Sequence, residues 1–566
     1  MKIGEVTKLT GLSSKAIRLY EEKGLIAVRR EDNAYRDYDE TCVNRLKQIK
    51  MFRDVGIGIS QLCLYFNGVI SLEELINERI DNIRKESSSS RKQLEECNKL
   101  LDILKTQEEI NFENVFIDTA DALLGLDIGT TTISVVVIDK EKGSLIDSYT
   151  IANACTIPTE KGLCEYDANW ILEKVFKILR FLKASYPNTK SIGITGQMHG
   201  VLCLDNEGKA ITSLVNWQDK RGDLQYDDAQ TYCQMIKEQT GYTIYSGYGF
   251  TTLYYNHVND LIPKDAKTYC TIMDYISMSV TGNTRPLIHA SNAASLGLYD
   301  LKEKQFDKQA IEKLGLAYLE VPKVTSDGDV VGYYEGIPVT VAIGDNQASF
   351  YGSVREEETA ALVNYGTGSQ ISVVIDAIKD IDENLEVRPY IGGKYLLCGS
   401  ALCGGKAYSL LEKFFSSYLA FAKIKSGSQY EVMNELAEKA YKERNILKVS
   451  TLFCGTRKDP ALRGMISELG EENFTPESLA LGVLQGMVDE LQWYFDCMQL
   501  ELRKSIVTSG NAVRKNRVLR QLLQDSFECE VYLSTNREEA AFGTALFAGV
   551  SNGIVTEKDA KAFIIY

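Results

Sequence analysis

The sequence predicts a multidomain protein in which an all-α N-terminal part precedes a larger, two-domain α/β part. Its 566 residues are too many for one hydrophobic core. Up to residue 108 the apolar residues follow helical spacing, whereas from Ala122 onward β-branched runs alternate with glycine-containing turns. A polar, acidic stretch at 109–121 lies between these two parts and is predicted to be a linker.

Composition excludes several classes of protein. An apolar fraction of 44% with a charged fraction of 25% is typical of globular proteins, and the chain has no bilayer-spanning run and no secretory signal. We therefore expect a cytoplasmic protein without membrane contact. The 13 cysteines lack metal-ligand spacing and are expected to be reduced. The net charge of -15 argues against nucleic-acid binding along the whole chain, yet residues 1–60 hold 12 Lys and Arg against 9 Asp and Glu.

Two short helices joined at Gly11 are predicted at the start of the chain. Ser13 or Ser14 would cap the second helix, which runs to about Lys23 before Gly24 ends it. This is the helix-turn-helix pattern, whose second helix can lie in a major groove. The side chains predicted to face DNA from this helix are Ser14, Lys15, Arg18 and Tyr20.

A basic hairpin, or wing, is predicted to follow, where side chains can lie against phosphates. Its predicted DNA contacts are Arg29, Arg30, Tyr35 and Arg36. The run IGEVTKLTGLSSKAIRLYEEKGLI, followed by YRDYDE and MFRDVGIGISQL, resembles the DNA-binding domain of MerR-family transcription regulators over residues 1–70. The resemblance implies double-stranded DNA with a palindromic promoter site as a partner. A helical protein-interaction domain is the alternative.

A long helix is predicted over residues 71–108. Apolar or small residues recur at alternating spacings of four and three from Ile76 to Leu104, which indicates a coiled-coil seam. We expect homodimerisation through the 76–104 helix, as the MerR resemblance also implies. The seam is weak at Ser87 and Ser90, so a helix packed on its own chain is the alternative.

The α/β part opens with a predicted β-hairpin in LLGLDIGTTTISVVVID. Glycine allows close approach of the backbone to a phosphate, the threonines offer donors, and Asp127 offers a hard oxygen for Mg²⁺. A second glycine-threonine turn lies in NYGTGSQ, at 364–370. Two such hairpins suggest two related domains facing each other across a nucleotide cleft, which resembles the actin-like, ribonuclease-H-like fold.

Within that class the chain resembles the FGGY carbohydrate kinases over about residues 122–550. The resemblance rests on GITGQMHGVLCLD, NWQDKR, SNAASLGLYD, AIGDNQASFYGSV, LCGGKAYSLLEKF and TSGNAVRKNRVLRQLLQD, in the family's order. It implies an N-terminal domain at 122–355 that binds sugar and phosphate, and a C-terminal domain at 356–566 that binds the nucleotide. GQMHG is similar to the motif of pentulose and heptulose kinases, whereas glycerol kinases have arginine and glutamate there.

The resemblance implies ATP and Mg²⁺ as cofactors and assigns roles to residues. Asp345, after an apolar strand, would be the base that deprotonates the sugar hydroxyl, and Asp127 would act through Mg²⁺. The sugar contacts implied are Gln197, Met198, His199, Trp217, Gln218 and Asp219. The ATP contacts implied are Gly129, Thr130, Thr131, Gly366, Thr367, Gly368, Gly404, Gly405, Gly510 and Asn511.

Three functions compete at this point. The first is a ketose kinase fused to a DNA-binding domain, with sedoheptulose as the first choice of substrate and xylulose or another pentulose as the second. The second is a sugar-sensing transcription regulator whose kinase domain is catalytically silent, although the presence of both Asp127 and Asp345 favours an enzyme. The third is an enzyme that the N-terminal module merely dimerises.

Overall fold

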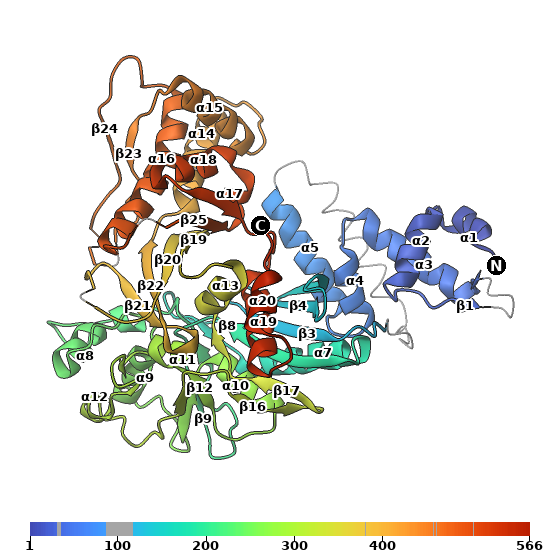
Figure 1. Ribbon diagram of the computed structural model, residues 1–566, viewed down its shortest axis with the longest axis horizontal. Coiled ribbons are helices and arrows are strands. Elements are labelled where there is room, and N and C mark those ends of the chain that lie inside the picture. The colour runs from blue at the N-terminus through green and yellow to red at the C-terminus, as the bar shows by residue number, and fades with distance from the viewer. Residues whose placement is uncertain (31–35, 87–116, 380, 457, 460, 502) are drawn as a thin grey trace.

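The computed structural model describes residues 1–30, 36–86, 117–379, 381–456, 458–459, 461–501 and 503–566 (Figure 1). Its first 86 residues form a helical module with one short hairpin. The elements of this module are α1 (Ile3–Thr10), α2 (Ser14–Glu22), β1 (Arg29–Arg30), β2 (Arg36–Asp37), α3 (Glu40–Asp54), α4 (Ile59–Phe66) and α5 (Leu72–Glu86). Ser13 caps α2 by accepting a hydrogen bond from the backbone N–H of Ala16, and Gly11 adopts a φ of 69° between the two helices. The helix-turn-helix arrangement is present.

The described part of the predicted seam packs inside its own chain. Ile76, Ile80 and Ile83 of α5 are all buried in the core that this module shares with the rest of the molecule. These three positions therefore do not form an open dimer seam, which is a correction to the sequence prediction. The remaining seam positions, from Ser87 to Leu104, lie outside the described residues.

A seven-stranded sheet forms the centre of the first lobe. Its strands are β3 (Ala122–Ile128), β4 (Thr132–Asp139), β5 (Leu145–Ala152), β8 (Thr189–Gly196), β16 (Val330–Tyr334), β17 (Ile337–Thr340) and β18 (Ile343–Gly344). The order is β16-β17-β8-β3-β4-β5, with β18 pairing with β8. The β3–β4 and β4–β5 pairs are antiparallel, while β8 runs parallel to β3, so the predicted hairpin is followed by a crossover through a helix.

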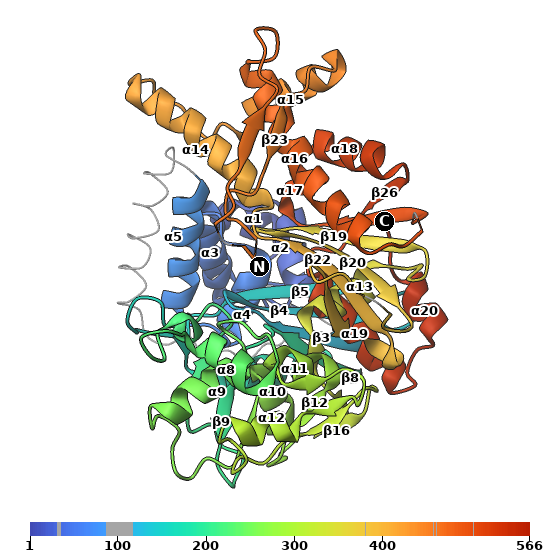
Figure 2. The same ribbon diagram turned by 90° about the vertical axis from the view of Figure 1, so that its left-hand side faces the viewer.

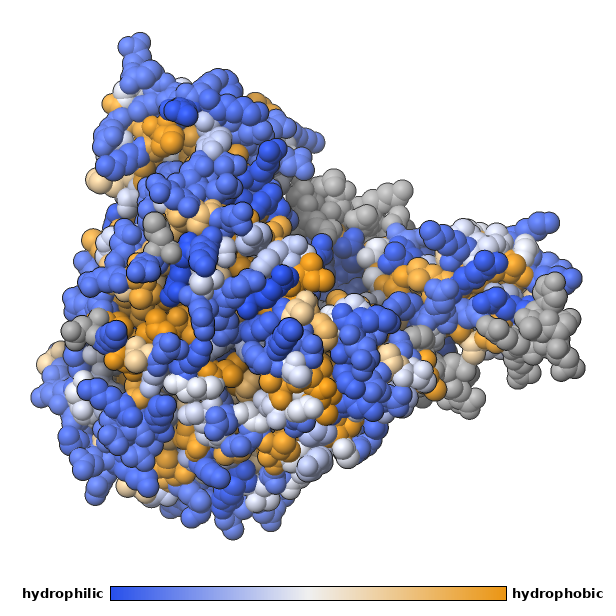
Figure 3. Space-filling model, in the orientation of Figure 1, coloured by the Kyte–Doolittle hydropathy of each residue, from blue (hydrophilic) through white to orange (hydrophobic). Residues whose placement is uncertain are grey.

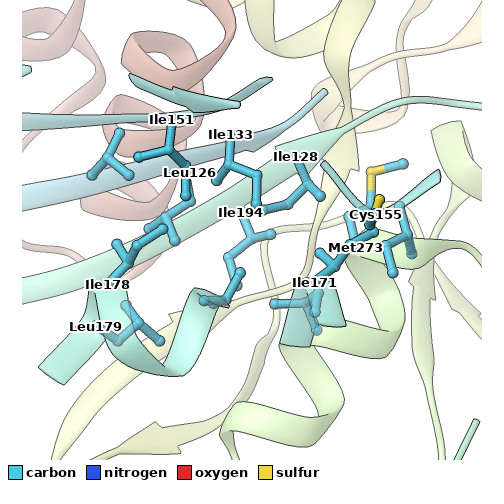
Figure 4. Close-up of a cluster of buried hydrophobic side chains, with 14 of the residues drawn as sticks. Leu126, Ile128, Ile133, Ile151, Cys155, Ile171, Ile178, Leu179, Ile194 and Met273 are labelled. Carbon is cyan, nitrogen blue, oxygen red and sulfur yellow. The ribbon is translucent and has the colours of Figure 1, made fainter. Parts of the chain in front are cut away.

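One face of this sheet packs on α7 (Ala168–Ser185) and α10 (Ile272–Val280). Figure 4 shows Leu126, Ile133 and Ile194 of the strands meeting Ile171 and Ile178 of α7. The five side chains are fully or almost fully buried, so this layer is a close-packed core that holds the strand ends in place.

A six-stranded sheet forms the centre of the second lobe. Its strands are β19 (Ala360–Tyr365), β20 (Ser369–Ile375), β21 (Glu386–Pro389), β22 (Tyr395–Ala401), β25 (Ser505–Ser509) and β26 (Glu530–Leu533), in the order β21-β22-β20-β19-β25-β26. β19 and β20 are antiparallel, and β25 is parallel to β19, so this lobe repeats the strand arrangement of the first. The helices of its outer layer are α14 (Gly405–Phe421), α15 (Tyr430–Glu443), α16 (Pro476–Cys497), α17 (Asn511–Lys515) and α18 (Arg517–Phe527).

Shorter elements complete the two lobes. Those of the first lobe are β6 (Thr156–Ile157), β7 (Glu165–Tyr166), β9 (Leu202–Leu204), β10 (Leu214–Val215), α8 (Tyr232–Thr240), α9 (Gly249–Val258), β11 (Thr268–Cys270), β12 (Leu287–His289), α11 (Ala290–Leu296), β13 (Tyr299–Asp300), β14 (Gln305–Phe306), α12 (Lys308–Lys313) and β15 (Lys323–Thr325). The second lobe adds the hairpin of β23 (Lys448–Ser450) and β24 (Met465–Ser467).

Two crossing helices join the lobes, namely α13 (Asp345–Ser353) and α19 (Glu539–Ser551). Their backbones touch at two glycines, because a Cβ on Gly543 would lie 1.8 Å from the carbonyl oxygen of Ala348 and 2.8 Å from the nitrogen of Gly352. Although α19 follows the second lobe in sequence, it packs on β3 and β8 of the first lobe, and α20 (Glu557–Ala562) follows it there. The apolar core around this crossing contains residues from both sheets.

The N-terminal module is docked on the first lobe. α4 lies against β5, the edge strand of the first sheet, and the buried side chains of the two parts form one continuous apolar core (Figures 1 and 2). Lys23, directly after α2, forms an ion pair of 3.1 Å with Asp147, and Lys174 of α7 forms one of 2.5 Å with Glu74 of α5. Figure 3 shows the module projecting from the body of the molecule with a largely hydrophilic surface.

Candidate active site

Three predicted residues meet at the carboxyl ends of neighbouring parallel strands. Asp127 of β3 is in register with Thr195 of β8, and Gly344 of β18 is in register with Gly196. Gln197 therefore follows β8, and Asp345 follows β18, at the same edge of the sheet. Carboxyl ends of parallel strands are where open α/β sheets bind ligands.

The carboxylates at this edge influence one another. Burial, together with the nearby Asp345 and Glu538, raises the pKa of Asp127 from 3.8 to about 8. Burial also raises the pKa of Asp345 from 3.8 to about 6, although the charge of Arg388 and hydrogen bonds from Asn346 oppose the rise. Carboxyl groups whose pKa values are raised by burial and by one another would ionise more readily beside a bound cation.

The Asp345 carboxylate is held from its own helix. It is the first residue of α13, and its Oδ1 accepts hydrogen bonds from the backbone N–H of Asn346 at 2.7 Å and from Asn346 Nδ2 at 3.0 Å. Asn346 is fixed in turn, because its Oδ1 accepts a hydrogen bond of 3.1 Å from Gln370 of β20. The orientation of this carboxylate thus depends on contacts from both lobes.

The first glycine-threonine turn, Gly129 to Thr131, contacts the predicted sugar residues. Trp217 donates a hydrogen bond of 3.0 Å from Nε1 to Thr130 Oγ1, and that hydroxyl lies 3.4 Å from Gln197 Oε1. The turn is supported from behind by Asn153, which donates from Nδ2 to the carbonyl oxygen of Gly129 at 2.8 Å. The other amide atom of Gln197, Nε2, is buried without a hydrogen-bond partner among the described residues, so it is available to a bound ligand.

Met198 and His199 differ in exposure. Met198 is buried beside Gly344, whereas His199 is half-buried and adopts a left-handed φ of 73° that is uncommon for histidine. His199 Nδ1 lies 2.9 Å from the carbonyl oxygen of Ser295, and its ring stacks on that of Tyr248 at 4.4 Å. The loop thus holds an imidazole in a fixed orientation.

Of the three residues predicted at 217–219, two are exposed and one is not. Trp217 and Gln218 lie at the surface, but Asp219 is fully buried. Its oxygens accept hydrogen bonds from the backbone N–H of Cys164 and from the guanidinium of Arg221 at 2.8 Å. The predicted direct sugar contact of Asp219 is therefore corrected: this carboxylate neutralises a buried arginine and holds the loop that carries Trp217.

A pocket of about 1160 Å³ opens beside the second glycine-threonine turn. The predicted ATP residues that line it are Gly366, Thr367, Gly405, Gly510 and Asn511. Gly510 adopts a φ of 96°, and a Cβ there would lie 2.3 Å from the carbonyl oxygen of Tyr365. Gly404 lies outside the lining, because its Cβ would lie 2.3 Å from Gly368, so these two glycines allow two backbone segments to approach each other.

Sequence reasoning missed several residues of the site. Lys406, Tyr408, Asn434, Lys515 and Asn516 line the same pocket, and Glu538 and Arg388 lie near the carboxylates. Asn434 Oδ1 accepts hydrogen bonds of 3.1 Å from Tyr408 and 2.8 Å from Asn516, so three segments converge there. Lys406, Tyr408, Lys515 and Asn516 lie inside the motifs LCGGKAYSLLEKF and TSGNAVRKNRVLRQLLQD, whereas Asn434, Glu538 and Arg388 lie outside every such motif.

The structure separates the predicted DNA contacts into three groups. Lys15 and Arg18 are exposed on α2 and Ser14 is half-buried, whereas Tyr20 is buried in the core, which corrects its assignment. Arg36 donates a hydrogen bond of 2.7 Å from Nε to Glu21, so it stabilises the hairpin against α2. The side chains of Arg29, Arg30 and Tyr35 lie outside the described residues.

Two absences hold for the described part of the chain. No helix there is long and apolar enough to span a membrane. No group of three or more histidine, cysteine or carboxylate side chains there can enclose a metal ion.

Family models match most of the chain. Residues 122–352 match the N-terminal domain of the FGGY family of carbohydrate kinases, and residues 361–552 match its C-terminal domain. Residues 1–67 match the MerR HTH family of regulatory proteins.

Curated relatives with known activities share about a quarter of their residues with this chain. Sedoheptulokinase of Mus musculus is 25% identical over 469 residues, which cover 75% of this chain and 96% of that protein. Glycerol kinase of Streptococcus uberis is 26% identical over 467 residues, which cover 77% of this chain and 91% of that protein. Among solved structures, xylulose kinase from Lactobacillus acidophilus has a TM-score of 0.66 at 19% identity, over 78% of this chain and 92% of that one.

Proposed function

Because this chain belongs to the FGGY family of carbohydrate kinases and carries a MerR helix-turn-helix region ahead of its kinase domains, we propose that it phosphorylates a ketose with ATP and binds promoter DNA. Sedoheptulose is the preferred candidate substrate, and xylulose or another pentulose is the second. The observation that carries the kinase proposal is the meeting of Asp127, Gln197 and Asp345 at one edge of the first sheet, together with the glycine-rich pocket of the second lobe.

Asp345 would act as the general base. Its carboxylate accepts the proton of the sugar hydroxyl while that oxygen forms a bond to the γ-phosphorus, and the bond between the γ-phosphorus and the bridging oxygen breaks as ADP leaves with the electron pair. Asn346 fixes the direction of the carboxylate, so the base does not have to be oriented during the reaction.

Asp127 fits the role of a magnesium ligand. Its Oδ1 is buried without a partner among the described residues, and its raised pKa indicates that the site lacks a compensating positive charge. Bound Mg²⁺ would neutralise charge on the ATP phosphates. The turns at Gly129–Thr131 and Gly366–Gly368 would hold those phosphates through backbone N–H groups, with Gly405, Gly510 and Asn511 around the nucleoside.

The sugar would lie between Gln197, His199 and Trp217. Gln197 Nε2 offers a donor, the imidazole of His199 lies beside it on the same loop, and the exposed face of Trp217 offers an apolar wall. The choice of a ketose is supported by Met198 and His199 at the position where glycerol kinases have arginine and glutamate. The choice of a heptulose is supported by the sequence similarity to sedoheptulokinases.

The test of the kinase is ATP consumption by the full chain against a panel of heptuloses, pentuloses and glycerol. We expect turnover with sedoheptulose or xylulose, lost in Asp345→Asn and kept in Asp376→Asn, a control carboxylate that is 87% exposed in the second lobe. Binding of sugars without turnover of any of them would instead support the catalytically silent sensor.

DNA binding by the N-terminal module is proposed on the exposure of Lys15 and Arg18 on α2, the second helix of the helix-turn-helix. We expect full-length protein to bind double-stranded promoter DNA with an affinity that falls as salt rises. Lys15→Gln with Arg18→Gln should weaken binding and reduce the salt slope by about two, about one per lost phosphate contact, whereas Lys142→Gln on the kinase should not. If no salt-dependent binding of DNA is measured, the alternative is favoured in which the module only mediates protein–protein interaction.

A further inference from the structure

Arg388 is a buried cation that the second lobe places beside the candidate base. It lies on β21, and only 10% of its side chain is exposed. Glu386 holds one edge of the guanidinium, with Oε2 accepting from Nε at 3.1 Å and from Nη2 at 2.5 Å. The remaining nitrogen, Nη1, is buried without a hydrogen-bond partner among the described residues. A buried guanidinium N–H without an acceptor lowers the stability of the protein, unless a ligand accepts a hydrogen bond from it.

The surroundings of Arg388 belong to the sugar side of the cleft. Its charge acts on Asp345, and Tyr248, which stacks on His199, acts on Arg388. The residue after it, Pro389, accepts a hydrogen bond of 2.9 Å from Gln347 of α13 through its carbonyl oxygen. β21 is thereby tied to the same short helix that begins with Asp345.

The strand register places the backbone of Arg388 away from the second glycine-threonine turn. Arg388 is in register with Leu396 of β22, and Leu396 with Val374 of β20. Ser369, next to the second phosphate turn, is instead in register with Ala401, five residues further along β22. Five residues of strand span roughly 17 Å, so the backbone of Arg388 lies well away from that turn, while its guanidinium reaches toward Glu386 on the side of the turn.

We propose that Arg388 is a substrate-binding residue that donates a hydrogen bond from Nη1 to an oxygen of the sugar, next to the hydroxyl that Asp345 deprotonates. This inference rests on the proposed kinase function. Because Glu386 neutralises Arg388, the pair suits a neutral hydroxyl or carbonyl oxygen better than a sugar carboxylate. The sugar would then be bound by His199 of the first lobe and Arg388 of the second, so its binding favours the arrangement in which the lobes face each other closely.

The experiment compares Arg388→Gln and Arg388→Lys with the full-length wild type. For Arg388→Gln we expect the KM of the preferred sugar to rise roughly 10- to 100-fold, the loss for one charged hydrogen bond, with the KM of ATP changed less than about twofold. Arg388→Lys keeps the charge beside Asp345 but not the planar fork, so it should raise the KM while leaving the acid limb of the pH profile in place. Arg388→Gln should move that limb to higher pH. Arg503→Gln, a partly buried arginine of the same lobe that bonds the backbone of Glu358, is the control and should keep the wild-type KM.

Monodeoxy sugars identify the oxygen that is bound. In the wild type, one deoxy analogue should raise the sugar KM by about the same factor as Arg388→Gln raises it with the intact sugar. In the variant, the same analogue should raise the KM little further. A folded Arg388→Gln protein with an unchanged sugar KM would overturn the inference while leaving the kinase proposal intact. An absence of turnover in the wild type, by contrast, would overturn the kinase proposal itself.

Discussion

The chemistry proposed for this molecule depends on two carboxyl groups whose ionisation the fold opposes. Asp345 and Asp127 sit at adjacent strand ends, and burial raises the pKa of both. Their partners differ, since Arg388 stabilises the charged form of Asp345 while Glu538 destabilises that of Asp127. The two residues therefore suit different tasks, a base that ionises unaided and a ligand that ionises when a cation arrives.

The activity should depend on pH through Asp345. A base acts only when ionised, so with saturating Mg²⁺-ATP we expect kcat to fall as pH decreases through about 6, where this carboxyl takes up a proton. The measurement is the initial rate between pH 4.5 and 8.5 in buffers of constant ionic strength. A plateau that persists to pH 4.5 would show that the base has an ordinary carboxyl pKa.

Asp127 should make the metal-free protein less stable as pH rises, whereas a carboxyl group in a salt bridge makes a protein more stable as pH rises. The pKa of Asp127 is about 8 when folded and near 3.8 when unfolded, so between these values the folded state alone holds the proton and stability falls as pH rises. Asp127→Asn removes this loss of stability because an asparagine side chain does not ionise. We expect its Tm at pH 8 to exceed that of the wild type by roughly 2–4 °C, the shift for about 1 kcal/mol in a domain of this size, with the difference gone near pH 4 and activity lost. Equal Tm values at both pH values would contradict the assignment.

At the scale of elements, local sequence patterns predicted the turns of the site, but they did not predict the residues that pack around it from elsewhere in the chain. Both glycine-threonine hairpins are where the sequence placed them, because a glycine turn between β-branched runs is a local signal. Tyr20 was misassigned because it lies three residues after Ile17, on the helix face that packs into the core. Arg388 and Glu538 gave no signal, since the contacts that bring them to Asp345 and Asp127 exist only after the lobes have packed together.

The crossing of α13 and α19 should be intolerant of any added side chain. In Gly543→Ala the new Cβ would meet the backbone of Ala348 and Gly352, so either the helices separate or the packing strains, at about 1–3 kcal/mol. We expect a lower Tm and, because Asp345 begins α13, a reduced kcat. Gly427→Ala, whose Cβ would have no heavy atom within 4 Å, is the matched control. Equal Tm and kcat in the two variants would mean that the crossing can relax.

At the scale of the whole molecule, the helix-turn-helix module and the first glycine-threonine turn both contact one strand, β5. β5 ends near Asn153, which holds Gly129, and also carries Asp147 and Tyr149. Asp147 Oδ2 accepts hydrogen bonds of 3.0 Å from Tyr149 and 3.0 Å from Tyr186 and pairs with Lys23 beside α2. A rearrangement of the turn on ligand binding would thus reach α2, the helix proposed to bind DNA, through a short series of packed side chains.

Ligands of the kinase should therefore change DNA affinity. We expect saturating sugar with Mg²⁺-ADP to shift the Kd for operator DNA about fivefold or more in the wild type. Asp147→Asn should reduce that response while changing the ligand-free Kd less than about threefold. Glu207→Gln, which breaks an exposed ion pair elsewhere on the first lobe, should respond as the wild type does. The link is wrong if Asp147→Asn responds fully, or if the wild type does not respond at all.

The packing of α4 against β5 also affects how the protein is degraded. β5 pairs with β4 on one side only, and the docked module shields the strand on which the sheet ends. A protease that removed the module would leave an exposed strand edge and an apolar surface, both of which promote aggregation. We therefore expect cleavage to yield insoluble fragments and no surviving kinase, so that cellular quality control would eliminate enzyme and regulator as one unit.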